Sequence, residues 1–214
     1  MDQDIQKDIY TKRCQLAIKA LKANDFEAIY ADNAKEALEK VISSIPKDAT
    51  VGIGGSITIR EIGLVEALEK QGNTIFEHWE KASTLEEKIK NRKEALTSDI
   101  YLASSNAITL DGQLVNIDGT GNRVAAMAFG PKKVIIIVGA NKLVDTLDEA
   151  FARIRTIAGP LNGRRLNLKT PCALTGHCTD CDSPDRMCKV SVVIEKKPNL
   201  SDITIVLVGE NLGY

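Results

Sequence analysis

The sequence has few aromatic residues, few histidines, almost no net charge and no long apolar run. Only 4% of its 214 residues are aromatic, and its two histidines, His78 and His177, limit histidine-based catalysis. The net charge of −1 gives no general attraction to nucleic acid or to an anionic membrane. No apolar segment approaches the roughly 20 residues that span a bilayer. We therefore expect no nucleic-acid partner and no membrane span.

The first residues, 1–8, are acidic and polar, unlike a secretory signal, so we predict a cytoplasmic location. With 43% hydrophobic and 27% charged residues, the chain has ordinary globular composition, and its length suits one α/β domain. Four of the five cysteines are clustered near the C-terminal end. Without an export signal, such a cluster favours metal or redox chemistry over structural disulfides.

The alternation of helix and strand patterns predicts an α/β fold with a mainly parallel, Rossmann-like sheet flanked by helices. Residues 134–138 are an unbroken β-branched run, typical of a strand buried on both faces at the centre of such a sheet. An amphipathic helix is predicted at about 5–23. Further helices are predicted at 33–45, 57–71, 84–96, 124–129 and 145–158, further strands at 26–31, 50–53, 73–76, 99–103, 190–195 and 203–208, and a β-hairpin at 107–117.

Three short polar loops border the predicted strands. Glycines let backbone amides turn towards a ligand, and a helix N-terminus favours an anion, although each loop could equally be a tight turn that only caps a helix. Polar residues at the carboxyl end of a strand lie where open α/β sheets bind ligands. The candidate ligand-binding residues are Gly54, Gly55, Ser56, Ser104, Ser105, Asn106, Gly119, Thr120, Gly121, Asn122 and Arg123.

Within these loops, Arg123 is the expected charged contact for an anion, because a planar guanidinium matches a carboxylate or phosphate in two hydrogen bonds. The alternative is that Arg123 pairs with a nearby aspartate and only braces its loop. The dipeptide His78-Trp79 follows a predicted strand and could line a pocket, but we predict a surface loop there.

Four cysteines, Cys172, Cys178, Cys181 and Cys188, are spaced by five, two and six residues. Two thiolates separated by two residues can reach one metal, and the outer cysteines can complete four soft ligands. The spacing suits zinc or an iron–sulfur cluster and does not separate the two. His177 is an alternative ligand, and a loop of reduced or disulfide-paired thiols is the alternative to a metal centre.

Four segments together resemble the LUD domain family, named from lactate utilisation. They are Val51-Gly52-Ile53-Gly54-Gly55-Ser56 with the helix that follows, Ser104-Ser105-Asn106-Ala107, Asp118-Gly119-Thr120-Gly121-Asn122-Arg123 and Gly209-Glu210-Asn211-Leu212-Gly213-Tyr214. The resemblance covers nearly the whole chain and implies a single LUD domain over 1–214, with the N-terminal helix at about 5–23 and a cysteine-rich metal-binding loop at 172–188. It implies the superfamily fold of ribose-5-phosphate isomerase and the CoA-transferases. The cysteine segment resembles that of a cysteine-bearing branch.

The resemblance implies a subunit or accessory of a system that oxidises a 2-hydroxy acid, L-lactate to pyruvate, with iron–sulfur oxidoreductase subunits as partners and a small anionic ligand. One alternative is a stand-alone enzyme on a sugar phosphate or acyl-CoA, with Asp118 or Glu210 as catalytic base or nucleophile. Another is a non-catalytic, metal-bearing interaction module. A homo-oligomer is a further expected assembly.

Overall fold

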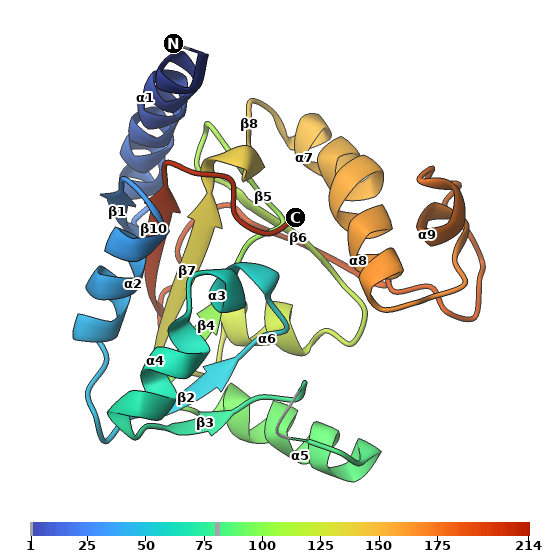
Figure 1. Ribbon diagram of the computed structural model, residues 1–214, viewed down its shortest axis with the longest axis horizontal. Helices are drawn as coiled ribbons and strands as arrows, with labels where there is room; N and C mark the ends of the chain where they lie inside the picture. The colour runs from blue at the N-terminus through green and yellow to red at the C-terminus, as the bar shows by residue number, and fades with distance from the viewer. Residues whose placement is uncertain (1, 80–81) are drawn as a thin grey trace.

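The computed structural model describes residues 2–79 and 82–214 (Figure 1). Its centre is a six-stranded sheet in the order β1-β10-β7-β4-β2-β3, and every neighbouring pair is parallel. The strands are β1 (Glu27–Ala31), β2 (Thr50–Ile53), β3 (Thr74–Phe76), β4 (Ile100–Ala103), β7 (Lys133–Gly139) and β10 (Asp202–Val208). The β-branched run forms β7, which lies inside the sheet between β10 and β4. The predicted α/β fold with a mainly parallel sheet flanked by helices is confirmed.

Helices cover both faces of this sheet (Figure 1). They are α1 (Asp2–Ala23), α2 (Ala34–Ser43), α3 (Ile57–Glu61), α4 (Leu64–Gln71), α5 (Leu85–Leu96) and α6 (Asn122–Ala128). Alternate residues of β7 serve opposite faces, because successive side chains of a strand point to opposite sides. Val134 and Ile136 pack with α1 and α6, whereas Ile135 and Ile137 pack with α2, α3 and α4. None of the helices in the described residues is long and apolar enough to cross a membrane.

Two of the predicted helix starts depend on polar caps that the structure contains. The Asn33 side chain accepts a hydrogen bond from the backbone N–H of Glu36 at the start of α2. Thr84 begins α5 with a capping box, in which Glu87 and Thr84 each accept from the other's backbone N–H. Such caps satisfy N–H groups that a helix leaves unpaired, and each contributes about 1 kcal/mol.

Two helix predictions are wrong at glycine or proline. The predicted helix 57–71 is two helices, because Gly63 takes a left-handed φ of 77° and separates α3 from α4. The predicted helix 145–158 does not end at Gly159-Pro160. It runs as α7 (Leu147–Arg153), a π-helical turn (Ile154–Ala158) and α8 (Gly159–Arg165). Pro160 has no N–H to donate in this continuous helix, and it lies just after the π-helical turn, where the regular bonding pattern changes.

A second, smaller sheet has the order β8-β5-β6-β9. Its strands are β5 (Ala107–Thr109), β6 (Leu114–Asp118), β8 (Leu143–Val144), joined to β7 by a short 3-10 turn (Ala140–Lys142), and β9 (Val190–Ile194). β5 and β6 form the predicted antiparallel hairpin, and β9 pairs with the far side of β6. This sheet packs on α7. The chain continues from α7 into α8 and then into α9 (Pro171–Thr175).

Candidate functional site

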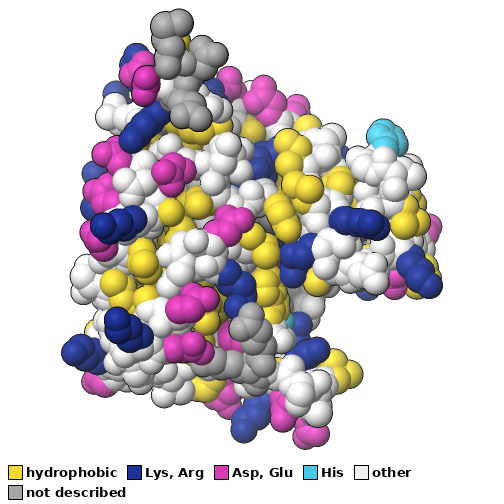
Figure 2. Space-filling model, in the orientation of Figure 1, with side chains coloured by type: hydrophobic (Ala, Val, Ile, Leu, Met, Phe, Trp, Pro, Cys, Tyr) yellow, Lys and Arg dark blue, Asp and Glu magenta, His cyan; other side chains and the backbone are white. Residues whose placement is uncertain are grey.

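A cavity of about 580 Å³ lies at the carboxyl edge of the large sheet, where α3, β4, β6, α6 and α8 meet. Figure 2 shows a recess between the lobe of α8 and α9 and the body of the molecule, with Lys and Arg side chains around it. The size suits a small organic ligand. Carboxyl ends of parallel strands are the usual ligand position in open α/β sheets.

The three predicted loops converge on this one cavity. The predicted residues that line it are Gly55, Ser56, Ser104, Ser105, Asn106, Asp118, Gly119, Thr120, Asn122 and Arg123. Gly54 and Gly121 belong to the same loops but do not form its wall. Glu210 lies elsewhere: it is exposed, and its carboxylate accepts a hydrogen bond from the backbone N–H of Ala34 at the start of α2. The loops are therefore brought together, and Glu210 is not among them.

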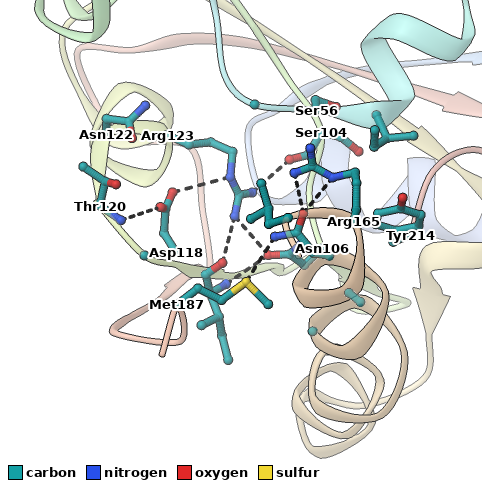
Figure 3. Close-up of a pocket in the computed structure, with 18 of the residues that line it drawn as sticks. Ser56, Ser104, Asn106, Asp118, Thr120, Asn122, Arg123, Arg165, Met187 and Tyr214 are labelled. Atoms are coloured by element: carbon teal, nitrogen blue, oxygen red, sulfur yellow. Dashed lines mark hydrogen bonds and ion pairs between the residues drawn. The ribbon is translucent and has the colours of Figure 1, made fainter. Parts of the chain in front are cut away.

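Arg123 reaches across the cavity wall into a set of protein acceptors (Figure 3). Its Nη1 donates to the backbone oxygen of Ser104 at 3.1 Å and to Oδ1 of Asn116. Its Nη2 donates to Oδ1 of Asn106 and to the backbone oxygen of Ile117, both at 3.0 Å. With these donors already committed, the geometry favours the bracing role of Arg123 over the expected role of principal anion contact.

Asp118 completes this arrangement and keeps one oxygen available. Its Oδ1 accepts from the backbone N–H groups of Thr120 and Gly121, each at 3.2 Å. Its Oδ2 lies 3.5 Å from Nε of Arg123, is buried and has no hydrogen-bond partner among the described residues. A buried carboxylate oxygen without a donor is ready to accept a hydrogen bond from a ligand.

The cavity wall carries more positive than negative charge. In the described part of the chain, the one acidic side chain on this wall is Asp118. Five basic side chains line the same wall: Lys88, Arg92, Arg123, Lys142 and Arg165. Burial lowers the pKa of Arg92, and its Nε is buried without a hydrogen-bond partner among the described residues. The cavity therefore offers positively charged groups that can bind an anion.

Sequence analysis missed most of these cations. Lys142 directly follows the carboxyl end of β7, so its position after the central strand was a usable signal. Arg165 belongs to a basic stretch of the sequence. Whether its side chain points into the cavity depends on helix α8, which was not predicted. Arg92 is one of many charges on α5, and nothing in the pattern distinguishes it from its exposed neighbours.

His78 and Trp79 line the cavity, so the prediction of a surface loop is wrong. The guanidinium carbons of Arg165 and Arg60 lie 4.3 and 4.7 Å from the centre of the Trp79 ring, within cation–π range. Burial, with a further contribution from the charge of Arg92, lowers the pKa of His78 to about 4. His78 is therefore neutral near pH 7. The loop folds inward because Glu77, almost fully buried, accepts from Trp79 N and from Arg60.

The π-helical turn borders the cavity as well, since Ile154 and Ala158 line it. Such turns widen a helix by one residue and are frequent at functional sites. Here the turn carries the chain into α8, which supplies Arg165 to the wall.

The four clustered cysteines surround a second cavity of about 60 Å³. Cys172 lies in α9, and Cys178, Cys181 and Cys188 lie in the irregular segment that follows. All four thiols are free and partly buried. Burial, together with the neighbouring thiols, raises the pKa of Cys188.

Arg186 holds this segment in place, because its guanidinium donates to the backbone oxygens of Cys181 and Cys188 at 2.6 and 2.9 Å. No three His, Cys, Asp or Glu side chains within 2–79 and 82–214 are spaced as a ready metal-binding group. The kind of ligand suits a metal centre, because four cysteines line one small cavity, and the centre itself stays a prediction. Zinc and an iron–sulfur cluster both take such a set.

The two cavities share part of their walls. Ile117, Met187 and Cys188 line both the large cavity and the cysteine-lined one. Met187 also contacts Asn162, whose Nδ2 lies 3.3 Å from its sulfur. A centre held by the four cysteines would therefore adjoin whatever occupies the large cavity.

A family model for the LUD domain matches residues 14–208. The chain belongs to the LUD domain family. Among solved structures, this LUD domain protein is similar to a DUF162 family protein from Deinococcus radiodurans, at 10% identity and a TM-score of 0.51. That match covers 94% of this chain and 98% of the other. At this identity the likeness shows the fold alone.

A second solved structure is ribose 5 phosphate isomerase A from Neisseria gonorrhoeae, at 18% identity and a TM-score of 0.35. This match covers 60% of this chain and 64% of the other, and its TM-score is too low to support an argument. No curated protein matches the chain.

Proposed function

We propose that this LUD domain protein binds a small carboxylate, a 2-hydroxy acid such as lactate or its 2-oxo product, and holds a metal or iron–sulfur centre through Cys172, Cys178, Cys181 and Cys188. It would act as a component of a system that oxidises 2-hydroxy acids. The family's link to lactate utilisation supports the substrate class. The cationic cavity supports an anionic ligand.

The single observation that carries the proposal is the shared wall between the two cavities. Cys188 lines both, so a centre bound by the cysteines would lie next to the bound carboxylate. A structural metal alone would not need that adjacency. A bound iron–sulfur cluster would supply one-electron transfer, whereas zinc would supply no redox chemistry.

The chain's own residues suit one of the two proton transfers of the reaction, the one from the hydroxyl group. Oxidation of a 2-hydroxy acid to a 2-oxo acid releases two electrons and two protons. Oδ2 of Asp118 is the buried acceptor for the hydroxyl proton, because Oδ1 is already engaged by the loop amides. Arg165 donates from Nε and Nη2 to Oδ1 of Asn162, and Arg92 donates from Nη1 to the backbone oxygen of Lys88, so each guanidinium is only partly engaged. Their remaining donors can hold the carboxylate, since charge-assisted hydrogen bonds are the strong ones.

The electrons would leave through partner iron–sulfur oxidoreductase subunits, because one four-cysteine centre cannot store both. We also propose a cytoplasmic location, which the five free thiols support because a reducing compartment keeps cysteines unpaired. A homo-oligomer remains part of the proposal.

Binding of lactate and pyruvate to anaerobically purified protein tests the proposal. Trp79 is the single tryptophan and lines the cavity, so its fluorescence reports occupancy. We expect saturable changes with both acids and, where the bound centre is an iron–sulfur cluster, a change in its visible or EPR spectrum. Arg165→Gln should weaken binding about ten- to a hundredfold. Arg164→Gln, an exposed neighbour with the same charge change, is the matched control.

Two results would overturn the proposal. One is the absence of any carboxylate binding while a sugar phosphate or acyl-CoA binds. The other is carboxylate binding that leaves the spectrum of a loaded centre unchanged, which would separate the ligand site from the cysteine site.

A further inference from the structure

Lys142 is a buried amine on the wall of the large cavity. It ends the short 3-10 turn that follows β7, and only 3% of the residue is exposed. No ion-pair partner accompanies it in the part of the chain that the structure describes. A buried, unpaired ammonium is costly, which favours either the neutral amine or a bound anion beside it.

The hydrogen bonds of Lys142 leave its nitrogen with one free position. Nζ donates to Oγ1 of Thr58 at 2.9 Å and to Oγ of Ser104 at 3.1 Å. Both hydroxyls donate onward to backbone oxygens, Thr58 to Leu212 and Ser104 to Ser105, each at 3.4 Å. They therefore accept from Lys142. A neutral amine would use its two N–H groups on them and keep its lone pair for the cavity.

The surroundings of Lys142 stabilise the neutral form. Burial, and then the charges of Arg153 and Arg123, lower the pKa of Lys142 from 10.5 to about 7. At pH 7 its neutral fraction is then about a thousandfold larger than that of an exposed lysine. The backbone at Gly213 closes over the amine, since a Cβ there would lie 3.3 Å from Nζ. Desolvated lysines of this kind are the ones that react with carbonyl groups.

We propose that Lys142 forms an imine with the carbonyl carbon of a 2-oxo acid bound in the large cavity. The choice of a 2-oxo acid rests on the proposed function. Nothing in that function requires a covalent bond, so the imine is an additional activity of the same site.

The step needs no oxidant. The lone pair of Nζ attacks the carbonyl carbon, and the carbonyl oxygen takes up a proton to give a carbinolamine. Loss of water, with both amine protons and the former carbonyl oxygen, then leaves a carbon–nitrogen double bond. Ser104 and Thr58 lie within hydrogen-bond distance of Nζ and can relay these protons.

The carboxylate of the 2-oxo acid needs a separate cation. Arg123 is committed to the protein, which leaves Lys88, Arg92 and Arg165 on the wall besides Lys142 itself. A carboxylate held there would orient the adjacent carbonyl, and orientation of this kind accounts for much of the rate of such additions.

Reductive trapping tests the imine. The full-length protein is incubated with pyruvate and cyanoborohydride, which reduces an imine to a stable secondary amine, and the adduct is located by peptide mass mapping. At pH 7 we expect the dominant adduct on the peptide that contains Lys142, with only minor trapping at exposed lysines. Lys142→Arg should abolish it, and Lys132→Arg, which changes an exposed amine outside the cavity, should not.

The pH dependence of trapping is a second measurement that needs no variant. The rate at Lys142 should level off above about pH 7, whereas trapping at exposed lysines should keep rising towards about pH 10.

Pyruvate binding, read from Trp79 fluorescence, without an adduct would overturn the imine and leave the proposed function standing. Adducts spread evenly over surface lysines would also overturn it. No pyruvate binding at all would overturn both.

Discussion

Arg123 and Asp118 hold each other in a nearly closed space, with Nε of Arg123 3.5 Å from Oδ2 of Asp118 and side-chain exposures of 12% and 11%. The other donors of Arg123 bind backbone and amide oxygens from the loop after β4 and from β6 itself (Figure 3). The pair therefore joins the large sheet to the small one at the cavity wall.

Replacing Arg123 with lysine should destabilise the fold. Lysine keeps the charge but cannot reach the same acceptors, so buried oxygens lose their donors. We expect the free energy of unfolding to fall by about 2–4 kcal/mol, measured by urea denaturation. Arg164→Lys, at an exposed position, should change it by less than about 0.5 kcal/mol. Unchanged stability with lost carboxylate binding would instead make Arg123 a ligand contact.

The four clustered cysteines should act together and Cys14 apart from them. Changing Cys172, Cys178, Cys181 or Cys188 to serine should each reduce bound metal, because a centre with four thiolates weakens when one is lost. Cys14→Ala is the control, since Cys14 lies on α1 and its side chain is buried in the core. Metal and sulfide analysis of anaerobically purified protein is the measurement. One zinc per chain would select zinc, and colourless wild-type protein without metal or sulfide would refute the centre.

His78 should make the fold acid-sensitive. Its pKa is about 4 in the folded protein and about 6.5 when unfolded, so the unfolded chain binds more protons between these values. Its contribution to stability is complete above about pH 6.5 and is lost as the pH falls towards 4.

The slope of unfolding free energy against pH in this window should become shallower in His78→Gln. NMR titration gives the pKa directly, with His177→Asn assigning the two histidine signals. A histidine signal at position 78 that titrates near pH 6.5 would contradict the buried environment.

Gly55→Ala should move Trp79. A Cβ at position 55 would lie 2.8–3.0 Å from three atoms of the indole, which is closer than packed atoms approach. The ring must move, which alters its contacts with Arg165 and Arg60 and should cost about 1–3 kcal/mol in stability. We expect a shifted fluorescence emission maximum and weaker carboxylate binding. An unchanged emission spectrum would mean that the ring does not pack on Gly55.

The sequence alone was sufficient for the main elements, because their signals are local. The β-branched run of β7 is typical of a strand that is buried on both faces inside a parallel sheet. Asn33 and Thr84 indicate helix starts because each forms a cap with a residue within four positions of the chain. The Gly-rich and Ser-Asn loops were recognisable because they follow strands, and the structure brings them to one cavity. The clustered cysteines were visible from spacing alone.

Tertiary structure decided what these residues do, because partners come from distant segments. Arg123 was expected to contact an anion because it starts a helix, but acceptors in the loop between β4 and β5 and in β6 take its donors. In the sequence Lys142 is an ordinary loop lysine. In the structure Thr58, Ser104 and the C-terminal segment enclose it. The helix that continues past Pro160 brings α8 to the cavity, and the pairing of β9 with β6 places Cys188 on the wall between the two cavities. Desolvation and shared walls depend on the packing of the whole chain, and a local pattern does not contain them.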